Sequence, residues 1–248
     1  MISLNGGLGH PDERVVFLAK PLYNLFMPSS SRYWAQRTQR HLVLAAIAAV
    51  GIGLIYLATA PPDFRHRLSM STAYSSLFFL AATLLVGPWN ILRRRPNPVS
   101  FDLRRDLGIW AGLLAILHTG VGLTVHLRGR MWMYFFKRLH PLKLQTGQFG
   151  WANYVGLVSA LLFLILLAIS NDLSLRSLGL KRWKSLQRWT YVAIALAIAH
   201  GILFQLVEKR HLPWVLLFAG LAVIMLVMQL AGVAYVRAGR RSLREDSQ

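Results

Sequence analysis

Six long apolar stretches, each free of Asp, Glu, Lys and Arg, alternate with shorter polar segments along the chain. Each stretch is about 19 to 25 residues long, and about 20 residues of α-helix cross a hydrocarbon core of about 30 Å. The pattern predicts membrane-spanning helices over residues 42–60, 71–92, 107–127, 149–171, 189–207 and 213–236. We therefore expect an all-α integral membrane protein built as a six-helix bundle.

Composition supports this class. Of 248 residues, 55% are hydrophobic and only 15% are charged, and the mean hydropathy is +0.44. A soluble chain carries nearer a quarter charged residues. The net charge of +19 comes from 28 Lys and Arg against 9 Asp and Glu, but these basic residues flank the apolar stretches. There they orient the helices and attract anionic lipid headgroups, so we expect no nucleic-acid partner.

Basic residues are distributed unequally between the two sides of the predicted bundle. Nineteen Lys and Arg fall on the side that carries both termini, and nine fall on the other side. The positive-inside rule therefore predicts that both termini are cytoplasmic. We divide the chain into an interfacial N-terminal segment over 1–41, a transmembrane domain over 42–237 and a short cytoplasmic tail over 238–248.

Two histidines lie inside predicted spans, at matching positions. His118 and His200 each come eleven residues after the start of a span, at residues 107 and 189. On the predicted topology these two helices are parallel, so both imidazoles lie roughly 16 Å into the membrane, near its middle. An ionisable side chain at this depth faces the bundle interior and has a partner, which makes the pair a candidate functional site.

A shared ligand and a structural hydrogen bond are the alternatives for this pair. The spans contain no carboxylate and the chain contains no cysteine, so two histidines underfill a zinc or copper site. Haem iron is completed by two axial imidazoles and then favours one-electron transfer. Small residues around both histidines leave room for a flat cofactor, although they also allow close helix packing.

The other ionisable residues point less clearly to chemistry. His126 ends the third span and is a candidate to bond a haem propionate or a partner group near the outer surface, or a side chain that simply reaches water. Arg104 and Arg105 begin the same span as candidate phosphate or propionate ligands, or as cytoplasmic anchors. The remaining histidines are expected in termini, loops or span edges, where solvation suffices: His10, His41, His66, His140 and His211. The acidic residues at the span ends are expected to be too few and too peripheral for a proton relay: Asp63, Asp102, Asp106, Asp172 and Glu208. We identify no catalytic residue.

Several motifs resemble the ferric reductase-like transmembrane domain. They are Thr72-Ala73-Tyr74, Thr83 to Pro88, Arg104 to Trp110 with Leu117-His118, Ala168 to Asn171, and Leu186-Gln187 with Tyr191 and Ala199-His200. Over residues 68–236 the chain is most similar to the YedZ-type haem-binding membrane subunit of bacterial methionine sulfoxide reductase systems. This resemblance implies a bundle in the bacterial inner membrane that holds b-type haem. It also implies electron transfer from a cytoplasmic or quinone-pool donor toward the outer face.

The chain departs from two-haem members of this family at the inner ligand pair. Those members carry a second pair of histidines nearer the cytoplasm, where this chain has Arg104 and Gln187. We therefore expect one haem, with His118 and His200 as the axial ligands of its iron. Without an inner haem the electron path from the cytoplasm is longer, which favours a quinone or flavin within the membrane as the donor.

These observations lead to two functional hypotheses. The first is a haem b electron-transfer subunit, part of an oxidoreductase system rather than a complete enzyme, that serves a partner redox protein or acceptor on the outer face. The second is a haem-free accessory subunit that keeps the fold within a larger membrane complex.

Overall fold

The computed structural model describes residues 30–59, 63–93 and 98–245, and the side chains of 33–59, 63–93 and 103–238. The chain divides into two units, Met1–Val43 and Leu44–Gln248. In the first unit, the described residues form the start of helix α2 (Ser30–Ala58), where Arg37 lies 5.8 Å from the ring of Trp34. Most of the predicted interfacial segment lies outside the described residues.

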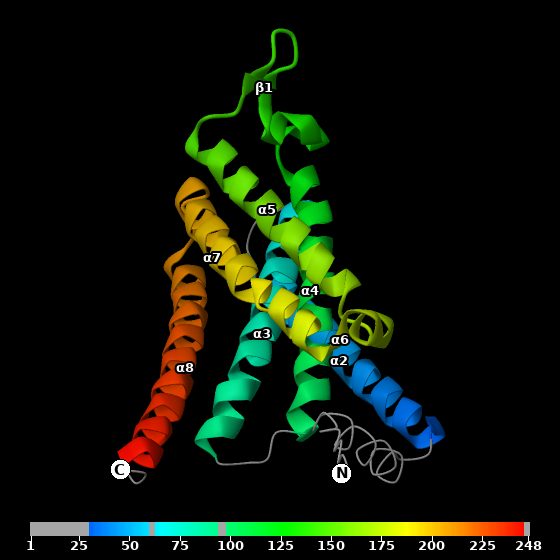
Figure 1. Cartoon of the computed structure of the whole chain (residues 1–248). Helices are drawn as coiled ribbons and strands as arrows, with labels where there is room; N and C mark the ends of the chain where they lie inside the picture. The colour runs from blue at the N-terminus through cyan, green and yellow to red at the C-terminus, as the bar shows by residue number, and fades with distance from the viewer. Residues whose placement is uncertain (1–29, 60–62, 94–97, 246–248) are drawn as a thin grey trace, which may run out of the picture. The chain divides into compact units, whose positions relative to one another are not determined.

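Helices make up most of the second unit (Figure 1). After the remainder of α2 come α3 (Phe64–Leu92), α4 (Pro98–Val125), α5 (Gln148–Ala168), α6 (Asp172–Gln187), α7 (Trp189–Val207) and α8 (Leu212–Glu245). Two short 3-10 turns, η1 (Leu127–Gly129) and η2 (Met131–Tyr134), follow α4. A small antiparallel hairpin of β1 (Phe136–Arg138) and β2 (Lys143–Leu144) then leads into α5.

The predicted fold class is confirmed. Within the described residues, six segments are long and apolar enough to cross a membrane: Tyr33–Ala58, Phe64–Leu92, Leu103–Val125, Gln148–Ala168, Asp172–Val207 and Leu212–Ala238. Figure 1 shows that α4 and α7 run in the same direction, whereas α3, α5 and α8 run in the opposite one. The two helices that carry His118 and His200 are therefore parallel, as the sequence predicts.

The helices pack as pairs around one apolar core. Helix α3 packs mainly on α4 and α8, and α5 packs mainly on α7. The core contains buried side chains from five of these helices and from α2, among them Leu44, Leu80, Ala111, Phe163, Ile194 and Met225. Many other large apolar side chains, such as Leu54 and Leu57 on α2, are exposed, as expected for a surface that faces lipid.

Helix α6 occupies the interval between the fourth and fifth predicted spans, for which the sequence predicted no helix. Asn171 caps its first turn by accepting a hydrogen bond from the Ser174 backbone N–H at 2.7 Å. Gly179 interrupts the helix with φ of 72°, and the buried Trp183 indole donates to the Ile169 carbonyl at 2.9 Å. This helix contains many charged residues, so it does not appear as an apolar stretch in the sequence. Its N-terminal cap and the contact of Trp183 with Ile169 stabilise it instead.

Hydroxyl groups join the helix pairs in the core. Ser76 on α3 donates to the Ala111 carbonyl of α4 at 2.9 Å, and Ser159 on α5 donates to the Ala193 carbonyl of α7 at 2.9 Å. Both bonds are buried. Small polar residues allow two helices to approach closely, and the bond adds to the packing energy.

Replacing Ser159 with alanine should lower the free energy of unfolding in detergent by about 0.6 to 1.7 kcal/mol, since the bond to α7 is lost. Ser71→Ala is the matched control. Ser71 is also buried, but its hydroxyl donates within α3, to the Leu68 carbonyl. Its removal should have a smaller effect. Equal losses in both variants would show that the interhelical bond contributes nothing specific.

Candidate haem-binding site

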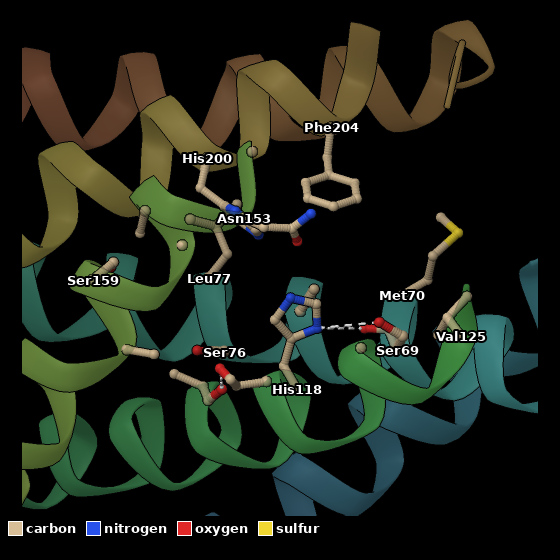
Figure 2. Close-up of a pocket in the computed structure, with 18 of the residues that line it drawn as sticks. Ser69, Met70, Ser76, Leu77, His118, Val125, Asn153, Ser159, His200 and Phe204 are labelled. Atoms are coloured by element: carbon tan, nitrogen blue, oxygen red, sulfur yellow. Dashed lines mark hydrogen bonds between the residues drawn. The ribbon is translucent and has the colours of Figure 1, made fainter. Parts of the chain in front are cut away.

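The structure brings His118 and His200 together. His118 comes from the C-terminal half of α4 and His200 from the middle of α7, and their ring centroids are 6.2 Å apart with an interplanar angle of 69°. Figure 2 shows the His118 ring pointing from α4 across a pocket toward His200. The two side chains that the sequence predicts at equal depth therefore face each other in the structure.

Each imidazole is held by a carbonyl on the neighbouring helix. His118 Nδ1 lies 3.0 Å from the Ser69 carbonyl oxygen of α3, and His200 Nδ1 lies 2.8 Å from the Ala152 carbonyl oxygen of α5. A carbonyl only accepts, so Nδ1 carries the proton in both rings and donates it. Nε2 of each neutral ring is then left with its lone pair, which is the form that binds a metal.

Small residues keep these two carbonyls accessible. In a helix, the residue four positions later covers the same face, and these positions hold Ala73 after Ser69 and Gly156 after Ala152. At Gly156 a Cβ atom would overlap the His200 ring. Any larger residue at this position would have to displace the imidazole, which lies directly against the α5 backbone.

The spacing of the two rings fits a metal ion between them. With metal–nitrogen bonds of about 2.0 Å and about 1.1 Å from each nitrogen to its ring centroid, a shared ion separates the centroids by about 6.2 Å. The pair supplies two ligands only, which suits iron already held by a porphyrin. Among the described residues, no group of three or more His, Cys, Asp or Glu is arranged to hold a metal by itself.

Both histidines line a cavity of about 200 Å³ between the two helix pairs. Its walls near the histidines are mainly apolar or small, and include Leu77, Ala115, Gly156, Ala197 and Phe204. Phe204 stacks near His200 with a centroid distance of 4.8 Å. A flat apolar ligand between the imidazoles would therefore meet side chains that gain from contact with it.

One part of the cavity wall is strongly polar. We call His66, His126, Glu208 and Arg210 the polar cluster; all four line the same cavity as the histidine pair. His66 Nε2 lies 3.3 Å from one Glu208 oxygen, and His126 Nε2 lies 3.1 Å from the other. Arg210 forms an ion pair with Glu208 as well. One carboxylate thus gathers three groups that can carry positive charge.

Glu208 has a pKa below the usual range of a carboxyl group. Burial alone would raise this pKa, but the hydrogen bonds with His126 and His66 and the positive charge of Arg210 outweigh it. The carboxylate is therefore ionised near neutral pH and holds the cluster together. Tyr134 of η2, which is 1% exposed, fixes the backbone at His126. Its hydroxyl donates a hydrogen bond to the Gly122 carbonyl and accepts one from the His126 backbone N–H.

The polar cluster corrects two expectations from the sequence. His66 and Glu208 are not peripheral and solvated, since the Glu208 side chain is only 11% exposed and pairs with His66. For His126 the structure decides between the alternatives in favour of a partner group, because its Nε2 pairs with Glu208. Sequence reasoning missed the cluster because its members come from three separate segments. The matching offsets, His126 eight residues after His118 and Glu208 eight after His200, were the available signal.

The remaining candidate residues lie elsewhere. Arg105 donates to Asp172 at 2.6 Å and so joins α4 to α6. Asp106, expected to be peripheral, is fully buried. Gln187 donates to the Ser170 hydroxyl at 3.2 Å, and Arg104 lies close to Gly87 of α3. Arg104, Arg105, Asp106, Asp172 and Gln187 all lie outside the lining of the cavity that contains the histidine pair.

Fold and site together define a multi-pass membrane protein with two facing histidines in an apolar cavity. Similar curated proteins include the protein-methionine-sulfoxide reductase heme-binding subunit MsrQ of Salmonella arizonae, 29% identical over 160 residues, and that of Salmonella paratyphi B, 30% identical over 160 residues. The matched part is 64% of this chain and 72% of each relative. No protein-family model matches the chain. The chain belongs to the family of protein-methionine-sulfoxide reductase heme-binding subunits.

Introducing a methyl group at Gly156 should destabilise the protein. Gly156→Ala should lower the free energy of unfolding by about 1 to 3 kcal/mol, because the new Cβ displaces the His200 ring. Gly220→Ala is the control, since a Cβ at that α8 position meets nothing within 4 Å. Alanine favours the helix there by about 0.5 to 1 kcal/mol. Thermal unfolding in detergent measures the stability of both variants. An increase in stability in Gly156→Ala as well as in Gly220→Ala would contradict the close packing of His200 on α5.

Removing the Glu208 charge should destabilise the protein in a pH-dependent way. The folded pKa of Glu208 lies below its ordinary value of 4.5, so ionisation contributes stability above pH 4.5. That contribution declines as the pH falls toward the folded pKa. Relative to wild type, Glu208→Gln should lose about 2 kcal/mol at pH 7, and the difference should shrink below pH 4.5. A difference that grows on acidification would contradict this assignment.

Proposed function

We propose that the chain is a membrane electron-transfer subunit that holds one b-type haem between His118 and His200. The proposal rests mainly on the two imidazoles, whose ring centroids are 6.2 Å apart. Each ring donates a hydrogen bond from Nδ1–H to a backbone carbonyl. Family membership supports it, because the relatives are named as heme-binding subunits. When bound, haem iron with two imidazole ligands exchanges single electrons and has no open position for oxygen.

The residues of the chain perform three tasks in this proposal. His118 and His200 would hold the haem iron through their unprotonated Nε2 atoms. The carbonyls of Ser69 and Ala152 orient the rings and raise their basicity, as outer partners do at metal sites. Apolar side chains such as Leu77 and Phe204 line the cavity and exclude water from the iron site.

The stoichiometry of one haem follows from the residues at the inner ligand positions. Gln187 is engaged with Ser170, and neither Gln187 nor Arg104 is a usual haem ligand. Arg104 and Arg105 remain candidates for holding an acidic group of a cofactor near the cytoplasmic side. The proposed donor is a quinone or flavin within the membrane.

The surrounding assignments complete the proposal. Both termini face the cytoplasm of a bacterium, in its inner membrane, because basic residues are concentrated on that side. Helix α4 and helix α7 then run outward, and electrons leave toward a partner redox protein or acceptor on the outer face. The chain is one component of an oxidoreductase system.

Absorbance spectroscopy of the purified protein tests this function. Protein from haem-replete cells should show a reduced-minus-oxidised haem b difference spectrum, with about one haem per chain. In His118→Ala and His200→Ala the haem content should fall to less than about a tenth, since a ligand is lost. His140→Ala, which removes an exposed imidazole, should retain wild-type content.

Two results would contradict the proposal. One is a wild-type protein that purifies without colour from haem-replete cells. The other is full haem content in both ligand variants. A haem-free accessory role would instead appear as stable co-purification with other subunits, while His118→Ala and His200→Ala still support the activity of the complex.

A further inference from the structure

Arg210 has one side of its guanidinium group engaged and the other side without a partner. Nη2 pairs with Glu208, whereas Nη1 is buried and has no hydrogen-bond acceptor among the described residues. The side chain is 16% exposed and lines the same cavity as His118 and His200. A buried N–H group of a charged side chain without a partner is unfavourable, because its desolvation is not compensated. This donor therefore indicates an acceptor that belongs in the cavity.

The position of the polar cluster defines where that acceptor lies relative to the histidine pair. Glu208 follows His200 by eight residues and His126 follows His118 by eight, which is roughly 12 Å along each helix. Phe204 and Phe149 occupy the interval, with ring centroids 6.1 Å apart, and Phe149 contacts His126 at 5.7 Å. The cavity wall thus changes from apolar to polar at one end.

A ligand that satisfies both parts has a flat apolar body and an acidic edge. The planar guanidinium group binds carboxylates with charge-assisted hydrogen bonds. Porphyrin of the haem b type has this form, because its two propionate carboxylates lie on one edge. Glu208 keeps Arg210 in place through Nη2 and leaves Nη1 for a second oxygen acceptor.

We propose that Arg210 is a cofactor-binding residue that receives a propionate carboxylate of the porphyrin held by His118 and His200. Glu208 is the positioning residue that fixes the guanidinium group, with His66 and His126 as its other partners. This inference rests on the proposed haem function. It assigns the orientation of the porphyrin, with its acidic edge toward the polar cluster and away from Arg104 and Arg105.

A comparison of two ligands and two proteins isolates the contact. Full-length protein produced under haem limitation is titrated in detergent with haem and with haem dimethyl ester, in which both propionates are esterified. Wild type should bind haem roughly 10- to 100-fold more tightly than the ester, because a charge-assisted bond is lost in the ester. Arg210→Gln should remove most of this preference, weakening haem binding and leaving ester binding unchanged.

Two further variants control for indirect effects. Arg130→Gln removes an exposed arginine outside the cavity and should keep the wild-type preference. Arg210→Lys keeps the charge without the planar fork and should give an intermediate preference. Because each preference is a ratio measured on one protein, a general loss of stability affects both ligands and cancels. If Arg210→Gln does not fold, the lysine variant and the wild-type ratio still decide the question.

Three results would overturn the inference. The first is wild type that binds the ester as tightly as haem, and the second is Arg210→Gln that keeps the full preference for haem. The third is Arg210→Gln that binds both ligands more weakly by the same factor. The last result would indicate that Arg210 acts only on the fold. Failure of the proposed function has a different signature, since wild type would then bind neither haem nor its ester.

Discussion

The hydrogen bond from each imidazole Nδ1 to a backbone carbonyl is the interaction on which the site depends. The Ser69 carbonyl fixes His118, and the Ala152 carbonyl fixes His200. Each bond satisfies a buried donor and also selects the tautomer, so that Nε2 is the free nitrogen. The acceptors are main-chain atoms of helices, which makes them rigid. The orientation of both rings is therefore set by helix packing, before any ligand enters.

Packing of helices in pairs explains how two distant segments reach one point. Helix α4 is held against α3, and α7 is held against α5, through small residues and buried serine hydroxyls. Each pair delivers one histidine together with the carbonyl that orients it. The space between the pairs is the cavity, which is apolar around the imidazoles and polar at the cluster formed by His66, His126, Glu208 and Arg210. The proposed iron ligands and the proposed partner of an acidic group therefore lie in different parts of one pocket.

The sequence was sufficient for the features that depend on local periodicity. Charge-free apolar stretches predicted the spans, and equal offsets within parallel helices predicted that His118 meets His200. Helix α6 and the environment of Glu208 were missed, because both depend on tertiary contacts. Glu208 lies at the end of a span like many solvated carboxylates, and its partner His66 is more than a hundred residues away. Burial and pairing of such a residue leave no periodic signal in the sequence.

Electron paramagnetic resonance of the oxidised, purified protein tests most directly whether His118 and His200 share one iron. Two imidazole ligands complete six-coordination, so we predict a low-spin ferric haem signal with about one iron per chain. In His200→Ala this signal should be replaced by a high-spin one, or be lost with the haem. A high-spin signal in the wild-type protein, or a low-spin signal unchanged by removal of either histidine, would contradict the account.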